Sequence, residues 1–238
     1  MKPTADPPDL PWLPALRGAF LVFEGPDGSG KSTQFRRLAD LLAGAGVKVC
    51  EVREPGGTPI GEGIRRILLD TSSEMTLRCE MLLYMASRAQ LVEERIRPAL
   101  ARGEVVLADR FVGSTYAYQG AAGGLPADEI RDVARVATAG ATPDLVLLFD
   151  VDQATAARRT RGVTTRPAKR RALPGANEAG TLFDDRIEQR GADFHGKVRE
   201  GYLAQARAEP ARHAVIDATR GPDEVWASLL AALAARYA

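Results

Sequence analysis

The sequence is poor in cysteine. Its two cysteines among 238 residues, Cys50 and Cys79, do not have the spacing of a metal site. Two cysteines also cannot form the disulfide framework that is typical of small secreted proteins. We therefore expect a protein of a reducing compartment, the cytoplasm, in which both cysteines are small buried apolar residues.

An excess of charge and long apolar runs are also missing. The 32 basic and 31 acidic residues nearly cancel, so net charge does not predict nucleic acid or an anionic membrane as a partner. No apolar run approaches the length that spans a membrane, and the first residues lack the apolar segment of a secretory signal. We find no internal repeat and no second domain, so we expect one globular domain without a nucleic-acid or membrane partner.

Proline is concentrated at the beginning of the chain. The five residues are Pro3, Pro7, Pro8, Pro11 and Pro14. This density predicts that residues 1–17 form a flexible, mostly extended arm and that the folded domain covers residues 18–238.

One stretch carries the strongest functional signal. An apolar run at 20–23 leads into 25–32, which fits the pattern G-x-x-x-x-G-K-[ST], and a helical pattern follows. Such a loop directs backbone N–H groups at phosphate oxygens in front of a helix N-terminus. Lys31 is expected to reach the β- and γ-phosphates, and the Ser32 hydroxyl is expected to coordinate Mg²⁺. The predicted triphosphate-binding residues are Gly25, Pro26, Asp27, Gly28, Ser29, Gly30, Lys31, Ser32 and Thr33.

Short apolar runs alternate with helical patterns along the rest of the chain. The predicted strands lie at 20–23, 47–52, 104–108, 144–149 and 214–216. The longest predicted helices span 76–100 and 183–202. This alternation predicts an α/β fold of three layers, in which a five-stranded parallel sheet has helices on both faces.

Two segments place charged side chains where a ligand could bind. Asp109 follows the third strand and suits a Walker-B carboxylate near Mg²⁺, and Arg110 could clamp a phosphate; the alternative is a surface ion pair. Tyr84 and Arg88 are four residues apart on the helix 76–100 and lie on one face. Arg88 either snorkels at the edge of the apolar stripe or stands beside an aromatic platform for a planar anionic ligand.

Taken together, four motifs resemble those of bacterial thymidylate kinases. They are GPDGSGKST at 25–33, REPGGT at 53–58, DRFVGSTYAYQG at 109–120 and DRIEQ at 185–189. The resemblance extends over about residues 18–236. The first motif alone indicates a nucleotide-binding protein, and the match to the family selects the substrate.

The resemblance implies a P-loop kinase fold with an extended lid, a homodimer, and transfer of the γ-phosphoryl group of ATP to dTMP with Mg²⁺. It places Asp27 near the acceptor's sugar, Tyr84 on the thymine ring, Arg88 on the base edge and Arg110 on the acceptor phosphate. The remaining implied assignments are Thr115 and Gln119 in the base pocket, Tyr118 against a ribose 2′-hydroxyl, Arg53 near the acceptor phosphate, and a cis peptide between Glu54 and Pro55.

The lid is where the chain departs from the family. An acidic P-loop residue such as Asp27 accompanies a catalytic lid arginine in the family, for which Arg161 is the first candidate and Arg159 the second. Here a lid insertion covers about residues 161–182. Its basic residues, which compete for the same role, are Arg166, Lys169, Arg170 and Arg171. Two interpretations stay open: a solvated loop without a role, or a basic segment that closes over ATP.

Three other functions share part of this pattern. A different P-loop kinase, acting on another deoxynucleotide or a deoxynucleoside, would keep the same motifs. A GTPase-like switch is disfavoured because no Asn-Lys-x-Asp segment follows the third or fourth strand. A nucleic-acid site at 166–171 has little support, because one short basic cluster without interleaved aromatics is weak evidence.

Overall fold

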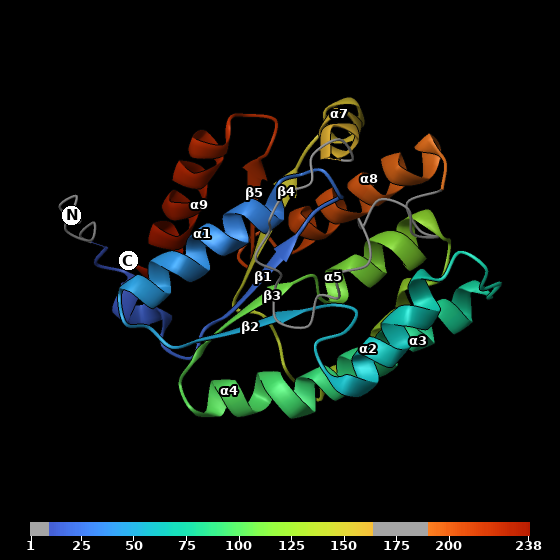
Figure 1. The fold of residues 1–238 in the computed structure, drawn as a ribbon, viewed down its shortest axis with the longest axis horizontal. Coiled ribbons are helices and arrows are strands. Elements are labelled where there is room, and N and C mark those ends of the chain that lie inside the picture. The colour runs from blue at the N-terminus through green and yellow to red at the C-terminus, as the bar shows by residue number, and fades with distance from the viewer. Residues whose placement is uncertain (1–9, 164–189) are drawn as a thin grey trace.

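The computed structural model describes residues 10–163 and 190–238, with the backbone alone for 161–163. Its described strands form one parallel sheet in the order β2-β3-β1-β4-β5 (Figure 1). The strands are β1 (Phe20–Glu24), β2 (Val49–Arg53), β3 (Val105–Asp109), β4 (Leu145–Asp150) and β5 (His213–Asp217). All five predicted strands are present, each within three residues of its predicted ends.

Helices cover both faces of this sheet, as the sequence predicts (Figure 1). On one side lie α1 (Lys31–Gly44) and α9 (Pro222–Tyr237). The other elements with helical geometry are η1 (Leu13–Leu16), α2 (Pro59–Leu69), α3 (Leu77–Leu91), η2 (Val92–Ile96), α4 (Arg97–Ala101), α5 (Val112–Thr115), η3 (Tyr116–Ala122), α6 (Ala127–Thr138), α7 (Gln153–Val163) and α8 (Ala192–Ala208).

Alternate side chains of the central strands enter two different cores. In β1, Leu21 and Phe23 pack with residues of α1 and α9, whereas Phe20 and Val22 pack with residues of α3, η2 and α4. Successive side chains of a strand point to opposite faces of the sheet, and here helices cover both faces. Both sets of side chains must therefore be apolar, which explains why the central strands appear in the sequence as continuous apolar runs. The result is the predicted three-layer arrangement.

The predicted helix 76–100 consists of three consecutive segments. Thr76 caps the first, α3, because its Oγ1 accepts a hydrogen bond of 3.4 Å from the backbone N of Cys79. The π-helical η2 follows, and Pro98 then lies in the first turn of α4, where its missing N–H costs no helical hydrogen bond.

The expectation that both cysteines are buried is right for Cys50 and wrong for Cys79, which is exposed near the start of α3.

The expectation of an extended N-terminal arm up to residue 17 is wrong for residues 10–17. Leu13–Leu16 forms the 3₁₀ helix η1, with Pro14 in its first turn. Trp12 is 2% exposed and Leu16 is fully buried, and both join the core between α1 and α9. Proline density misleads here because two apolar side chains four residues apart gain more from burial than the segment loses in chain entropy. Residues 1–9 lie outside the described part.

Three other predictions fall partly on segments that the structure does not describe. These are the lid insertion, the DRIEQ motif and the first residues of the predicted helix 183–202; the described part of that helix, α8, begins at Ala192.

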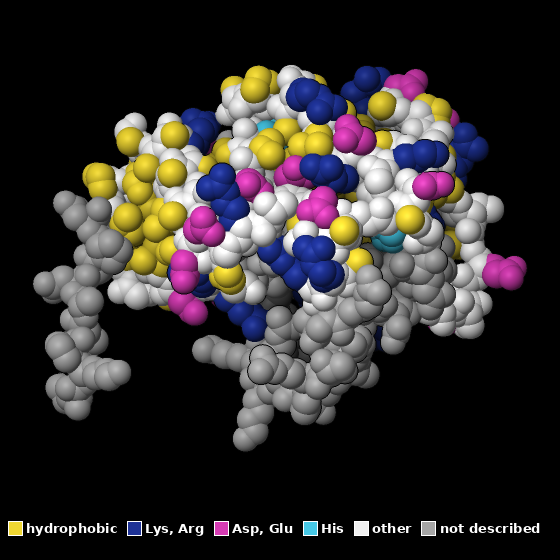
Figure 2. Space-filling model, turned by 90° about the horizontal axis from the view of Figure 1, so that it is seen from above, with side chains coloured by type: hydrophobic (Ala, Val, Ile, Leu, Met, Phe, Trp, Pro, Cys, Tyr) yellow, Lys and Arg dark blue, Asp and Glu magenta, His cyan; other side chains and the backbone are white. Residues whose placement is uncertain are grey.

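On the face that Figure 2 shows, Lys and Arg side chains are intermixed with Asp and Glu side chains. Among the described helices, none is both long enough and apolar enough to cross a membrane.

Candidate active site

The predicted ligand-binding segments meet at the carboxyl ends of β1 and β3. These strands are neighbours, and Phe23 of β1 is in register with Asp109 of β3. The loop 25–30 leaves β1 and enters α1, while Arg110 follows β3 directly. Ligands of open α/β sheets bind at this edge.

The loop 25–30 is shaped by glycine. Gly25 has φ of 141°, and a Cβ there would come within 2.6 Å of the Phe149 carbonyl oxygen. Gly28 has φ of 79°, and a Cβ there would come within 2.5 Å of the Ala156 carbonyl oxygen. A side chain at either position would therefore displace the loop. Gly30 is the N-cap of α1 and provides no side-chain cap, so the first turn of the helix presents N–H groups for an anion.

Asp27 links the two cations that the sequence assigns to different substrates. Its Oδ1 accepts a hydrogen bond of 3.0 Å from Lys31 Nζ and one of 2.8 Å from Arg110 Nη2. The side chains of all three residues are less than one-fifth exposed. One carboxylate thus holds a P-loop lysine and a strand-end arginine at the same point.

Arg110 is held from several sides. Its Nη1 lies 3.2 Å from Ser114 Oγ and 3.1 Å from the hydroxyl oxygen of Tyr202, and its guanidinium lies over the Tyr118 ring. Its backbone has φ of 73°, which is uncommon for a residue with a side chain. Its N–H nevertheless donates to the carbonyl oxygen of Phe23, at 3.0 Å, so the surrounding structure keeps this conformation.

Glu24 organises the loop that carries Arg110. Its carboxylate, buried at the end of β1, accepts hydrogen bonds from the backbone N–H groups of Phe111 and Ser114 and from the hydroxyls of Ser114 and Tyr202. Burial raises the pKa of Glu24, and the positive charge of Arg110 opposes that shift. Burial also raises the pKa of the Tyr202 hydroxyl well above its ordinary value, which keeps it protonated as a donor to Glu24.

Asp109 is oriented toward the P-loop lysine. Its Oδ1 lies 3.8 Å from Lys31 Nζ, and this buried atom has no hydrogen-bond partner among the described residues. A buried carboxylate oxygen without a donor fits a cation that carries its own water. Across residues 10–163 and 190–238, no cluster of three or more acidic, histidine or cysteine side chains could hold a metal by itself.

Arg88 is 1% exposed and therefore does not snorkel. Its Nε and Nη2 donate to the Glu54 carboxylate over 2.5 to 3.0 Å. Its Nη1 donates to Thr115 Oγ1 at 3.2 Å, and Nη2 also donates to the carbonyl oxygen of Phe111 at 3.0 Å. The arginine thus connects α3 to the loop after β2 and to α5. The Glu54–Pro55 peptide in that loop is cis, as predicted.

Glu54 is a second buried carboxyl in this region. Burial raises its pKa from the ordinary 4.5 to about 7, although the positive charge and hydrogen bonds of Arg88 pull in the opposite direction. A carboxyl whose pKa is raised by folding stabilises the fold most below its unfolded-state pKa. That contribution is lost as the pH rises toward the folded-state pKa, here from about 4.5 to about 7.

We expect the variant Glu54→Gln to gain stability relative to wild type as the pH rises from 5 to 7. Glutamine cannot titrate, so only the wild type loses the contribution of this proton, by up to about 1.4 kcal/mol per pH unit. The unpaired Arg88 lowers the stability of the variant at every pH, so the pH dependence of the difference is the informative quantity. Urea unfolding at several pH values measures it, with the exposed Glu93→Gln as control. A difference that stays constant between pH 5 and 7 would show that Glu54 does not titrate there.

Thr115 and Gln119 face α3 from the next segment of the fold. Gln119 is 2% exposed, and its Nε2 donates to Glu80 Oε1 on α3 at 2.7 Å. Tyr84 lies on α3 between Glu80 and Arg88, half-buried. The structure therefore brings Tyr84, Arg88, Thr115 and Gln119 together on two facing segments.

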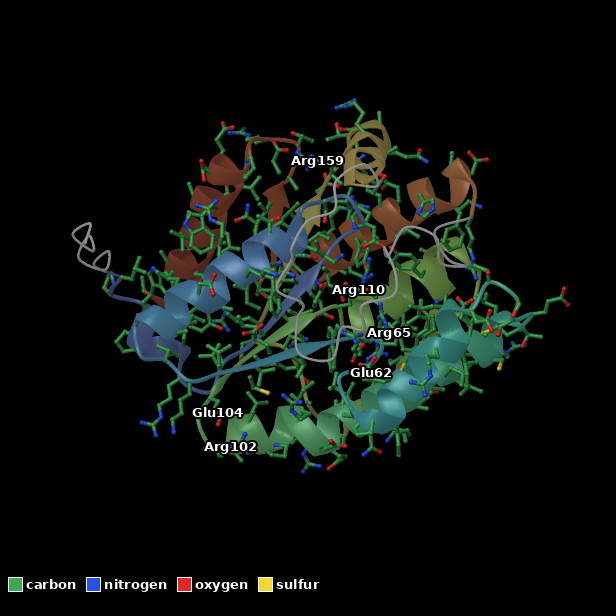
Figure 3. The ribbon with its side chains drawn as sticks, viewed as in Figure 1. Glu62, Arg65, Arg102, Glu104, Arg110 and Arg159 are labelled. Atoms are coloured by element: carbon green, nitrogen blue, oxygen red, sulfur yellow. The ribbon has the colours of Figure 1, made fainter. Side chains whose placement is uncertain are left out.

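Arg53 is bound by α2. Its Nη2 donates to both carboxylate oxygens of Glu62, at 2.8 and 2.9 Å, and its Nη1 donates to the carbonyl oxygen of Pro55 at 2.9 Å. Arg65, one turn further along α2, also donates to the Pro55 oxygen, at 3.0 Å. In the view of Figure 3, Glu62 and Arg65 lie on one side of Arg110, and Arg159 lies on the other. Arg53 thus lies at the same edge of the sheet as Arg110.

Arg159 packs beside the P-loop on the side away from α2. Its Nη1 donates to the carbonyl oxygens of Gly28, at 3.5 Å, and Ala218, at 2.7 Å. Its Nη2 donates to the carbonyl oxygens of Thr219 and Arg220, both at 3.2 Å. The guanidinium therefore connects α7 to the P-loop and to the segment after β5. The side chain of Arg161, the first lid candidate, lies outside the described part of the chain.

Comparison with known proteins gives one family. The family model for thymidylate kinase matches residues 23–229. The chain belongs to the thymidylate kinase family. It is 46% identical over 220 residues to a thymidylate kinase of Deinococcus radiodurans, covering 92% of this chain and 98% of that one. It is 47% identical over 207 residues to one of Solidesulfovibrio magneticus, covering 87% and 94%. The crystal structure of thymidylate kinase from Ehrlichia chaffeensis superposes with a TM-score of 0.68 at 28% identity, over 90% of this chain and 98% of that one.

Four residues of this thymidylate kinase site were missed by sequence reasoning. They are Glu24, Glu62, Glu80 and Tyr202. Glu24 offered a usable signal, because it ends a buried strand just as Asp109 does. Glu80 precedes Tyr84 by four residues and shares its helix face, which was a second signal. Glu62 and Tyr202 become recognisable only from their partners in the fold.

Proposed function

We propose that this chain transfers the γ-phosphoryl group of ATP to dTMP, giving ADP and dTDP. The observation that carries the proposal is the shared carboxylate of Asp27, which holds Lys31 and Arg110 at 3.0 and 2.8 Å. Lys31 belongs to the loop that binds a triphosphate, and Arg110 belongs to a strand end that can clamp a second phosphate. Two mutually repelling anions can then be held side by side, which is the main requirement of phosphoryl transfer.

The proposed chemistry needs no side-chain nucleophile. The attacking group is a phosphate oxygen of dTMP, which is already anionic near neutral pH, so a strong general base is dispensable. Catalysis then consists of positioning and of neutralising the charge on the transferring group. Lys31 and Arg110 supply cations for this purpose, and Asp27 keeps both in place and lies near the acceptor's sugar. Arg53, at the same sheet edge, is proposed to assist with the acceptor phosphate.

Ser32 and Asp109 are proposed to hold Mg²⁺. The support is the buried Oδ1 of Asp109, which lies beside Lys31 without a hydrogen-bond donor among the described residues. When bound, the ion would neutralise the charge of the β- and γ-phosphates.

The base of dTMP is proposed to bind between α3 and the α5–η3 segment. Tyr84 would stack on its ring, and the edges would meet Arg88, Thr115 and Gln119. Tyr118, whose ring packs beside Arg110 and Tyr202, would disfavour a ribose 2′-hydroxyl.

Replacing Tyr84 by alanine is expected to weaken dTMP binding by about 1–3 kcal/mol, because the stacking surface is lost. The Michaelis constant for dTMP should rise accordingly, while that for ATP stays near its wild-type value. Tyr84→Phe keeps the ring and serves as the matched control. An unchanged Michaelis constant for dTMP in Tyr84→Ala would contradict the stacking assignment.

The lid arginine is proposed to be Arg161. The second candidate, Arg159, already donates to four carbonyl oxygens, those of Gly28 and of residues 218–220. It would have to break these hydrogen bonds to reach a bound nucleotide.

We further propose a cytoplasmic homodimer. The support for a dimer is that Ile60 and Ile67 of α2 and Leu82 of the adjacent α3 are half or more exposed. Sedimentation of the purified chain tests this part.

A coupled ADP-release assay tests the proposed function. ATP and Mg²⁺ are supplied with each nucleoside and nucleoside monophosphate in turn. We expect dTMP to be the best acceptor by at least about tenfold in kcat/KM, or about 1.4 kcal/mol. A larger kcat/KM for another deoxynucleotide or for a deoxynucleoside would reassign the chain to a different P-loop kinase activity.

A further inference from the structure

Two hydrogen-bonded cross-links join α3 to the α5–η3 segment. At one end, Arg88 Nη1 donates to Thr115 Oγ1 at 3.2 Å, and at the other, Gln119 Nε2 donates to Glu80 Oε1 at 2.7 Å. On each side the linked residues are separated by multiples of four, so each set lies along one face. Tyr84 lies on α3 midway between the two cross-links. A planar ring stacked on Tyr84 would therefore have one cross-link toward each side.

Glu80 is a buried acidic side chain to which two described residues of different kinds donate hydrogen bonds. It is fully buried, and its Oε2 accepts a hydrogen bond of 2.6 Å from Arg190 Nη2, while its Oε1 accepts the bond from Gln119. Arg190 is the first described residue after the 164–189 segment, and its side chain is 24% exposed. A buried ion pair is often no more stabilising than apolar residues of similar volume, so packing alone does not account for a charge at this position.

The carboxylate fixes which way the Gln119 amide points. An ionised carboxylate only accepts hydrogen bonds, so the amide must turn its NH₂ group toward Glu80. Its carbonyl Oε1 then points away from Glu80. No described residue donates to that oxygen. A ligand with an N–H group on its edge would satisfy it, whereas a ligand with a lone pair there would face a second acceptor.

We propose that Glu80 is a positioning residue that determines base specificity by holding the Gln119 carbonyl toward the ring stacked on Tyr84. Thymine and uracil carry an N–H group at N3, and cytosine carries a lone pair at that atom. The oriented carbonyl therefore accepts from N3 of dTMP and repels N3 of dCMP. This inference rests on the proposed dTMP kinase function and adds to it the residue that rejects cytosine.

The variant Glu80→Gln tests the proposal. Its amide can donate as well as accept, so Gln119 can flip and offer its NH₂ group to the base. We expect the ratio of kcat/KM for dTMP to that for dCMP to fall by at least about tenfold. The Michaelis constant for dTMP should rise, and the Michaelis constant for ATP should not change. The matched control is Arg190→Met, which removes the other described partner of the same carboxylate and should leave the ratio at its wild-type value.

A second variant keeps the proposal testable if Glu80→Gln does not fold. Gln119→Ala removes the amide but leaves the pairing of Glu80 with Arg190, and it should lower the dTMP-to-dCMP ratio by a similar factor. In the double variant Glu80→Gln/Gln119→Ala, the change at Glu80 should have no further effect on the ratio.

Three results would overturn the proposal. They are an unchanged ratio in folded Glu80→Gln, an unchanged ratio in Gln119→Ala, and an Arg190→Met variant that loses discrimination to the same extent as Glu80→Gln. A merely structural role for Glu80 would lower thermal stability and reduce kcat/KM for both nucleotides equally. Wild-type protein without dTMP kinase activity would contradict the proposed function itself, so the two failures are distinguishable.

Discussion

Replacing Lys31 by alanine is expected to reduce kcat by at least about a hundredfold to a thousandfold. The ammonium group is buried beside Asp27 and Asp109, at the point where the loop 25–30 enters α1. Its loss removes a cation that neutralises the phosphates during transfer, and a preorganised donor of this kind is worth about that much. Steady-state ADP formation with saturating dTMP measures the effect.

The matched control for this experiment is Lys48→Ala. Lys48 is an exposed lysine outside the site, so its removal should leave kcat unchanged. Both variants should unfold cooperatively, because neither change opens a cavity in the apolar core. If Lys31→Ala kept more than a few per cent of wild-type activity, Lys31 would not have the role assigned to it.

Replacing Arg110 by methionine is expected to lower kcat/KM for dTMP by about a hundredfold to a thousandfold. Truncating one member of a buried, hydrogen-bonded charge pair costs about 2–5 kcal/mol, and here the acceptor phosphate loses its clamp as well. The Asp27 carboxylate keeps Lys31 as its partner, so the fold should persist. The loss should appear with dTMP as the varied substrate and only weakly in the Michaelis constant for ATP.

Arg97→Met is the control for Arg110→Met, because Arg97 is an exposed arginine paired with Glu93 at the far end of α3–α4. Its kinetic constants should match those of wild type. Equal losses of affinity for ATP and for dTMP in Arg110→Met would contradict the assignment of Arg110 to the acceptor side.

The sheet and the phosphate loop could be predicted because their signals are local. Leu21, Phe23 and their neighbours form short apolar runs, and parallel pairing of such runs requires helical crossovers. The loop 25–32 has a fixed spacing, because its glycines must avoid carbonyl oxygens only a few ångströms away. The position of Asp109 and Arg110 was also predictable, because they lie at the carboxyl end of the third strand and the carboxyl ends of parallel strands share one edge of the sheet.

The partners of the charged residues could not be predicted in the same way. Nothing near Arg88 in the sequence indicates that Glu54, 34 residues earlier, neutralises it. The same holds for Glu24, because one of its two hydroxyl partners, Tyr202, is 178 residues away. Such contacts depend on tertiary packing. The place where Trp12 packs could not be predicted for a related reason, because its burial depends on a surface that α1 and α9 create together.

Transfer of labelled phosphate tests the central claim most directly. Wild-type protein is incubated with ATP labelled at the γ-phosphate, Mg²⁺ and dTMP, and the labelled products are separated. The account predicts that the label moves to the β-phosphate of dTDP, one equivalent for each ADP formed, and that omitting dTMP stops ADP formation. Label released as inorganic phosphate at the same rate with and without dTMP would contradict it.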